Sequence, residues 1–234
     1  MNLVANYRDP KQTMRIKTKV LYAAANLFLT KGFAATTVKE IAAEAGVSPS
    51  TMLYIHESKE NILAALFKEI LNRQFAKTEE LLKGVSDDKM FFYAAETTLQ
   101  LYIVESNEYI RELYNTAYSL PKTTEIIQRM LTEKLEYVFK EHLPDLQTKD
   151  FFELEIAACG IMRGFMSIPC DMYFTMDRKI RRYLETTFLI YRVSDERIEK
   201  IIKFISWFNF EELAGQVIQS MFRSLATEPQ WLDA

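Results

Sequence analysis

Few residues in this sequence interrupt helices. Six glycines and six prolines are spread over 234 residues, and apolar residues recur at intervals of three and four through most of the chain. This combination excludes a protein built from many short strands and tight turns. The sequence therefore predicts an all-α protein, long enough to bury a large core in one or two domains.

Cysteine and long apolar runs are also scarce. Cys159 and Cys170 are the only cysteines, and their spacing suits neither a metal site nor a redox motif, so we expect free thiols in a reducing compartment. No N-terminal stretch resembles a signal peptide, and no apolar run approaches the roughly 18 residues of a membrane span. These absences predict a soluble, cytoplasmic protein with no membrane partner.

The patterns of catalytic and cofactor sites are missing as well. The two histidines, His56 and His142, have Leu53 and Phe139 three positions earlier, where a di-iron bundle requires glutamate. The sequence contains no phosphate-binding loop, nucleophile elbow or dinucleotide-binding glycine pattern. We therefore expect no enzymatic activity, no catalytic residue, no metal site and no cofactor.

Positive charge is concentrated at one end of the chain. The net charge is -3, yet residues 1–60 carry eight Lys and Arg against five Asp and Glu. The first part therefore has a charge of +3 and the remainder has -6. This asymmetry predicts a small basic N-terminal region on an acidic body.

Two helices are predicted at the start of the basic region. An apolar repeat that runs from Ile16 to Phe28 predicts the first helix, and Gly32 ends it. Thr37 and Glu40 then form a capping box, in which each side chain satisfies a backbone N–H group of the other residue. This signal predicts a second helix of about nine residues.

The next signals place a third helix close behind the second. Gly46 ends the second helix, and Ser48 and Pro49 suit the cap and the first position of the third. The third helix runs to about Ile55. Two short helices joined at Gly46 make a helix-turn-helix, and Ser58 then caps a long fourth helix.

Residues 16–63 contain six short motifs in a fixed order. They read AAANLF, KGF, TTV, EIA, AGVS and SKE. This series resembles the N-terminal domain of the TetR family of bacterial transcriptional regulators. The resemblance implies an N-terminal arm and helix-turn-helix DNA-binding domain at residues 1–57, and a larger helical ligand-binding and dimerisation domain at residues 58–234.

The family resemblance also implies contacts with DNA. A homodimer would place its third helices in successive major grooves of a nearly palindromic double-stranded operator. Phosphate contacts are expected from Thr37, Thr51, Tyr54 and Lys59, and base contacts from Ser48, Pro49 and Ser50. The third helix has no Arg, Asn or Gln for a bidentate base contact, so selectivity would rest on hydroxyl and apolar contacts and on DNA shape. Basic residues near the N-terminus form either a DNA-contacting arm or a solvated tail: Arg8, Lys11, Arg15, Lys17 and Lys19.

The stretch SPSTMLYIHESKE departs from the family pattern. Ser50 replaces the usual glycine, and one aromatic residue of the core is missing. Either Leu53 and His56 stand where the family has tyrosine and phenylalanine, or Tyr54 and His56 are the aromatic pair and the phenylalanine has been deleted. We expect Ile55 or Leu53 to fill the gap. The departure leaves a second function open, that of a TetR-like adaptor that acts through a protein partner and binds DNA weakly.

The remainder of the chain has no sharp motif. Helices are predicted at residues 88–106, 108–119, 121–142, 148–174, 177–191 and 194–226, with a break in the last one near Asn209. The family resemblance implies a dimer interface built from two helices of each subunit, and two apolar or small-residue stripes are candidates for it, although both could instead face the core of one protomer. They are Ala157, Gly160 and Gly164 on one helix, and Phe210, Leu213, Ala214, Val217, Met221 and Leu225 on another.

The family resemblance finally implies a cavity for a small-molecule effector in the body. The expected ligand is apolar or amphipathic, because the body is rich in aromatic and methionine side chains. The candidate lining residues are Tyr102, Tyr114, Tyr118, Met162, Phe165, Met166 and Tyr173, with Arg163 as a counter-ion for an anionic ligand. The implied function is a transcriptional repressor that this ligand releases from its operator.

Overall fold

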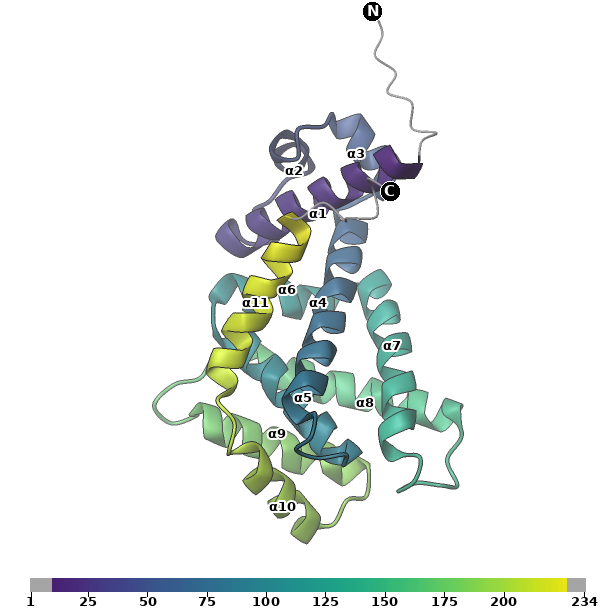
Figure 1. The fold of residues 1–234 in the computed structure, drawn as a ribbon, viewed down its shortest axis with the longest axis vertical. Coiled ribbons are helices and arrows are strands. Elements are labelled where there is room, and N and C mark those ends of the chain that lie inside the picture. The colour runs from purple at the N-terminus through teal and green to yellow at the C-terminus, as the bar shows by residue number, and fades with distance from the viewer. Residues whose placement is uncertain (1–9, 227–234) are drawn as a thin grey trace, which may run out of the picture.

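The computed structural model describes residues 10–226, and this range folds into eleven α-helices without a strand (Figure 1). The predicted all-α fold is confirmed. The side chains of residues 222 and 224–226 are not described. The helices are α1 (Pro10–Lys31), α2 (Val38–Glu44), α3 (Pro49–His56), α4 (Lys59–Leu82), α5 (Lys89–Glu105), α6 (Glu108–Ala117), α7 (Pro121–Phe139), α8 (Thr148–Ser167), α9 (Met176–Ile190), α10 (Asp195–Ile205) and α11 (Phe210–Ala226).

Helices α1 to α3 form a small head at one end of the molecule (Figure 1). Their boundaries follow from local capping. The Thr37 hydroxyl accepts from the Glu40 N–H, and the Glu40 carboxylate accepts from the Thr37 N–H at 2.8 Å. The Ser48 hydroxyl accepts from the N–H of Thr51 at 3.0 Å. Each bond satisfies an N–H group that the first turn of a helix leaves unpaired, and the predicted helix-turn-helix is the result.

The basic residues of the predicted arm lie mostly on α1. This helix begins at Pro10, so Lys11, Arg15, Lys17 and Lys19 occupy its first three turns rather than an extended segment. Proline is well suited to the first helical position because it lacks an N–H that would be unpaired there. Arg8 lies outside the described residues.

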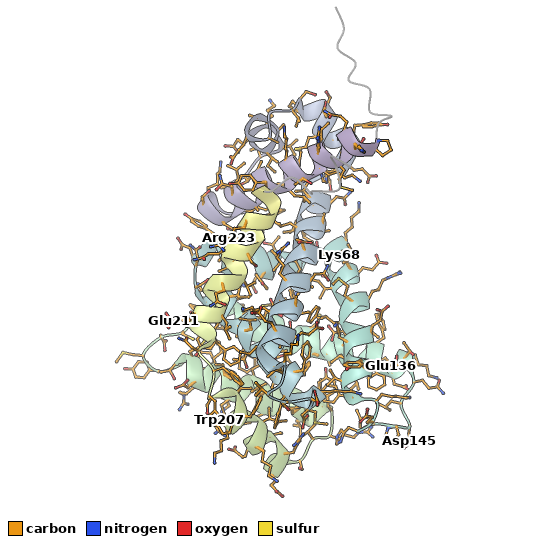
Figure 2. All side chains as sticks on the ribbon, viewed as in Figure 1. Lys68, Glu136, Asp145, Trp207, Glu211 and Arg223 are labelled. Atoms are coloured by element: carbon orange, nitrogen blue, oxygen red, sulfur yellow. The ribbon has the colours of Figure 1, made fainter. Side chains whose placement is uncertain are left out.

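The body surrounds α5, which is buried along nearly its whole length. Helices α4 and α6 to α11 all pack against it, and their side chains fill the interior between the ribbons (Figure 2). Helices α4, α6 and α11 join this body to the head. Both α4 and α11 extend from the body to α1, and both contact it (Figure 1).

The position of α11 corrects one prediction. The candidate interface residues Phe210, Ala214, Val217 and Met221 are at most 4% exposed, and α11 packs against α1, α4 and α5 of its own chain. This stripe therefore belongs to the core of the protomer. The described side chains of the stripe include Leu213, which is half-buried, whereas that of Leu225 is not described.

Two helix boundaries in the body also bear on the predictions. The helix predicted at 148–174 ends at Ser167, because Pro169 forces an extended conformation on Ile168 and cannot continue a helix. The break predicted near Asn209 is present between α10 and α11. Within residues 10–226, no helix combines the length and the apolar character that a membrane crossing requires.

Candidate DNA-binding and ligand-binding sites

The predicted base-contacting residues come together at the start of α3. Ser48, Pro49 and Ser50 are exposed, and the Ser48 hydroxyl oxygen lies 2.9 Å from that of Ser50 and 2.8 Å from that of Thr51. Tyr54 follows one turn later and is 73% exposed. The head thus presents a group of hydroxyls and one aromatic ring on a single outward surface.

His56 takes an inward position at the end of the same helix. It is 8% exposed, whereas Leu53 is 41% exposed. Ile55 is half-buried and packs against the core, so it is the more buried of the two residues expected to replace the missing aromatic side chain. Burial, and secondarily the charge of Lys17, lowers the pKa of His56 to about 4. The imidazole is therefore neutral at pH 7 and serves as a core side chain.

Lys59 and Thr37 already have partners within the head. The Lys59 ammonium donates to the carbonyl oxygens of Phe33 and Thr36, each at 2.9 Å, and lies 4.1 Å from the centre of the Phe33 ring. The Thr37 hydroxyl donates to Glu40 at 2.8 Å. Lys59 therefore fastens the start of α4 to the turn between α1 and α2.

A second contact joins that turn to the body. The backbone N–H of Ala34 donates to the Glu112 carboxylate of α6 at 2.8 Å. Gly32 lies beside this bond with a φ of +89°, and a Cβ atom there would be 2.3 Å from the Glu112 Oε2 atom. Only glycine combines this backbone conformation with so close an approach.

The body contains a narrow, mainly apolar cavity. The space between its lining atoms is about 470 Å³, part of it open to solvent, and about 40 Å³ admits the centre of a water molecule. An entering ligand must therefore displace side chains. The lining residues come from six helices: Phe75 of α4; Phe92, Tyr93, Glu96, Thr97 and Gln100 of α5; Leu131, Lys134, Leu135 and Val138 of α7; Glu155, Ala158, Cys159 and Met162 of α8; Tyr183 of α9; and Tyr118, which caps α6.

The predicted ligand residues divide into three groups around this cavity. Tyr118 and Met162 line it. Tyr114 and Met166 are buried beside it, in contact with Gln74 and Gln100 respectively. The others do not line it. Phe165 packs on Phe174 and Tyr183, Tyr102 stacks on Phe210, and Arg163 and Tyr173 are exposed.

Two glutamates in the cavity were missed at the level of sequence. Glu96 is 5% exposed and Glu155 is 2% exposed. Burial raises the pKa of Glu96 to about 7 and that of Glu155 to about 8. The available signal for Glu96 was a single acidic residue in a helical stretch that carries no other charge, FFYAAETTLQLYIV.

A buried hydrogen-bond network connects the cavity with α4 and α6. Gln74 of α4 donates to the Glu96 carboxyl at 2.5 Å and to the Gln100 side-chain oxygen at 3.3 Å. The Tyr114 hydroxyl donates to Gln74 at 3.1 Å, and Gln100 donates to the Tyr118 hydroxyl at 2.9 Å. Any change at Glu96 therefore acts directly on the helix that leads to the head.

A helix-turn-helix head joined by a long helix to an all-helical body defines a class of DNA-binding regulators. The family model described as "Bacterial regulatory proteins, tetR family" matches residues 20–66. This segment covers most of the head and the first two turns of α4. Residues 20–66 therefore match the N-terminal domain of the TetR family of bacterial regulatory proteins.

Curated relatives support the same family. The transcriptional repressor KstR2 of Rhodococcus jostii is 32% identical over 82 residues, which are 35% of this chain and 40% of that protein. The transcriptional regulator QacR of Staphylococcus aureus is 29% identical over 136 residues, which are 56% of this chain and 69% of that protein. The chain thus spans well under half the length of the KstR2 relative that it matches.

Solved structures resemble the fold over a larger part of the chain. RolR in complex with resorcinol matches with a TM-score of 0.65 and 12% identity, over 83% of this chain and 96% of that one. SmeT, the repressor of the Stenotrophomonas maltophilia multidrug efflux pump SmeDEF, matches with a TM-score of 0.53 and 20% identity, over 76% and 91% of the two chains. At these identities the likeness concerns the fold alone.

Proposed function

We propose that this protein is a cytoplasmic, sequence-specific transcriptional repressor that leaves a palindromic operator when a small apolar or amphipathic molecule enters the body. Residues 1–57 would bind DNA, and residues 58–234 would bind the ligand and form the dimer. The observation that carries the proposal is the outward surface at the start of α3, which lies within the segment matched by the family model. The structural relative crystallised with resorcinol supports a small-molecule effector.

The proposed DNA-binding surface consists of the predicted residues, of which some contact bases and the others contact phosphates. Ser48, Pro49 and Ser50 meet base edges in the major groove, because they lead the exposed end of α3. Thr37, Thr51 and Tyr54 hold phosphates on either side. Lys59 uses two of its three N–H groups within the head, and the third reaches a phosphate.

The dimer forms through the outward face of α8. Phe152 is 41% exposed and Ile156 is 49% exposed, and added Cβ atoms at Gly160 and Gly164 would meet nothing within 4 Å. On the neighbouring α9, Leu189 is 69% exposed. Apolar and small residues on two adjacent helices would allow close packing against the same helices of a second copy.

Release from DNA follows from two arrangements of the heads. The ligand favours one arrangement only through its differential affinity for the two states. Helix α4 carries both Phe75 in the cavity wall and Lys59 in the head, and Gln74 joins it to Glu96. A ligand that displaces these side chains moves α4 and changes the separation of the two heads.

Fluorescence anisotropy tests the proposal directly. The full chain is titrated onto labelled fragments of the DNA upstream of its own gene and onto scrambled duplexes, over a series of salt concentrations. We expect tight, fragment-specific binding whose affinity falls steeply with salt. Weak binding that is equal on all duplexes would overturn the repressor and favour the protein-binding adaptor. The variant Ser50→Ala should lower the preference for the operator more than the affinity for scrambled DNA.

A further inference from the structure

The two carboxyl groups of the body cavity are exceptional for an apolar interior. Glu96 and Glu155 line the same space and are at least 95% buried. Among the described residues, Glu96 accepts one hydrogen bond, from Gln74, and Glu155 accepts one, from the Cys159 thiol at 3.1 Å. The second oxygen of each carboxyl has no hydrogen-bond partner in that part of the chain. Buried carboxyls normally have several donors or a cation nearby.

No cationic side chain of the described residues pairs with either carboxyl within 4 Å. Lys134 lies at the cavity wall, but its ammonium is 3.7 Å from Glu79 and 4.8 Å from the centre of the Phe75 ring. Its side chain is 40% exposed. Lys134 therefore leaves the interior carboxyls without a directly bound positive charge.

Aromatic rings surround the same space. Phe75, Phe92, Tyr93, Tyr118 and Tyr183 all line the cavity. The negatively polarised faces of such rings attract organic cations, and the attraction grows where water is excluded. A positive charge buried in this space requires a negative partner, and the rings and the two carboxyls together supply it.

We propose that the effector of this cavity is a lipophilic organic cation, such as an aromatic amine salt or quaternary ammonium compound, held by Glu96 and Glu155 among the aromatic rings. The inference rests on the proposed function, in which this cavity is the effector site. It replaces the anionic ligand that Arg163 suggested in the sequence, because Arg163 is exposed on the outer face of α8. The carboxyls of Glu96 and Glu155 face the interior of the cavity, whereas the Arg163 side chain does not.

The same assignment explains how the ligand reaches α4. A cation beside Glu96 competes with the Gln74 amide for the carboxylate, and Gln74 is the α4 member of the buried network. When Glu96 turns to the ligand, the hydrogen bonds from Gln74 to Glu96 and Gln100 rearrange together. The positive charge of the ligand therefore causes α4 to move.

Ligand binding should also release protons. The titratable groups that face Glu96 from the surrounding helices are Glu155 and Cys159 of α8, Lys134 of α7, Tyr93 of α5, Tyr114 and Tyr118 at α6, and Tyr183 of α9. Burial raises the pKa of Cys159 and of the four tyrosines above their usual range, so the two carboxyls carry the titration between pH 6 and pH 9. A bound cation lowers their pKa values, and its affinity rises with pH.

Isothermal titration calorimetry with two isosteric probes tests the ligand class. Benzyltrimethylammonium carries a permanent charge, and neopentylbenzene has the same shape with carbon in place of nitrogen. We expect the full chain to bind the cation at least about tenfold more tightly at pH 8.5. Its affinity should fall by about tenfold between pH 8.5 and pH 6, since at least one carboxyl must lose a proton. Equal affinities for the two probes, or an affinity that does not depend on pH, would overturn the proposal.

Three variants locate the charge recognition. Glu96→Gln and Glu155→Gln keep the size of the side chain, and each should weaken benzyltrimethylammonium by about tenfold or more while leaving neopentylbenzene within about twofold. Glu153→Gln is the matched control, because Glu153 is exposed on the same helix as Glu155 and should change neither affinity. A loss of both probes together in the cavity variants would indicate a structural role and contradict charge recognition.

The failure of this inference differs from the failure of the proposed function. Resorcinol serves as a neutral hydroxyl-bearing probe in the same titrations. Operator release by resorcinol but not by benzyltrimethylammonium would preserve the repressor and overturn the cationic ligand. Cation binding without any operator binding would preserve the ligand class and overturn the repressor.

Discussion

The head and the body of this protein specify their functions in different ways. In the head, residues that act together lie within a few positions of one another, as in the hydroxyl group of Ser48, Ser50 and Thr51. In the body, the two carboxyls of the cavity come from α5 and α8, 59 positions apart in Glu96 and Glu155. A short helix can present a recognition surface by itself, whereas a ligand cavity exists only after several helices have packed.

The largest effect is expected from a buried ion pair of the body. The Lys179 ammonium is 1% exposed and lies 2.8 Å from the Glu105 carboxylate, which also accepts from Arg111 and from the backbone of Cys170. Lys179→Met leaves Glu105 without its most buried partner and should lower the free energy of unfolding by about 3 kcal/mol. Urea unfolding measures the change. Arg178→Met, an exposed change on the same helix, should cost less than about 0.5 kcal/mol, and equal losses in the two variants would contradict the role of the pair.

The next effect concerns the contact where head meets body. Gly32→Ala imposes both an unfavourable φ and a collision with Glu112, so we expect a loss of about 2–3 kcal/mol. Gly46→Ala has a similar φ of +68° but no neighbour within 4 Å, and it should cost only about 1–2 kcal/mol. Thermal and urea unfolding compare the variants. Similar losses at both glycines would mean that the Glu112 side chain moves away from the added Cβ atom without a cost in free energy.

A change at Lys59 separates a structural role from a DNA contact. Lys59→Met removes two hydrogen bonds to carbonyl oxygens, which should lower stability by about 1–2 kcal/mol. If the third N–H meets a phosphate, the slope of log affinity against log salt should also decrease by about one. Lys68→Met, on the exposed side of α4 below the head (Figure 2), should leave the slope unchanged. A lower stability with an unchanged slope would show that Lys59 stabilises the head but does not contact a phosphate.

The smallest effect is a pH dependence that belongs to the head. The pKa of His56 is about 4 in the folded chain, below its ordinary value of 6.5, so the unfolded chain binds the proton first as the pH falls. Stability should therefore decrease from pH 6.5 towards pH 4, with a fall in melting temperature of a few degrees. His56→Phe should remove this part of the dependence.

The matched control for that measurement is His142→Gln, an exposed change in the body. It should retain the pH dependence of the unaltered chain. Melting curves at pH 7 and pH 5 are compared by circular dichroism. A His56→Phe variant as sensitive to pH as the control would show that carboxyl groups alone set the dependence.

The same contrast explains how far prediction from sequence reached. The caps at Thr37, Ser48 and Ser58 are confirmed because a cap depends on neighbours three positions away. The α11 stripe was a candidate either for an interface or for the core of one protomer, and it packs in the core, because periodicity shows that a face is buried but not which surface covers it. Tyr118 and Met162 were placed in the cavity, but Glu96 was not, because burial of a carboxyl among six helices depends on tertiary packing.

The packing of α11 against α1 has a consequence for protein synthesis. A ribosome produces the recognition helix and α4 early, whereas α11 emerges after α1 to α10. The contact of Arg73 with the Ser220 carbonyl and the burial of Met221 therefore wait until translation has passed residue 221. A nascent chain attached to the ribosome carries a complete helix-turn-helix without this support. The head acquires its fixed orientation relative to the body only after α11 has left the exit tunnel.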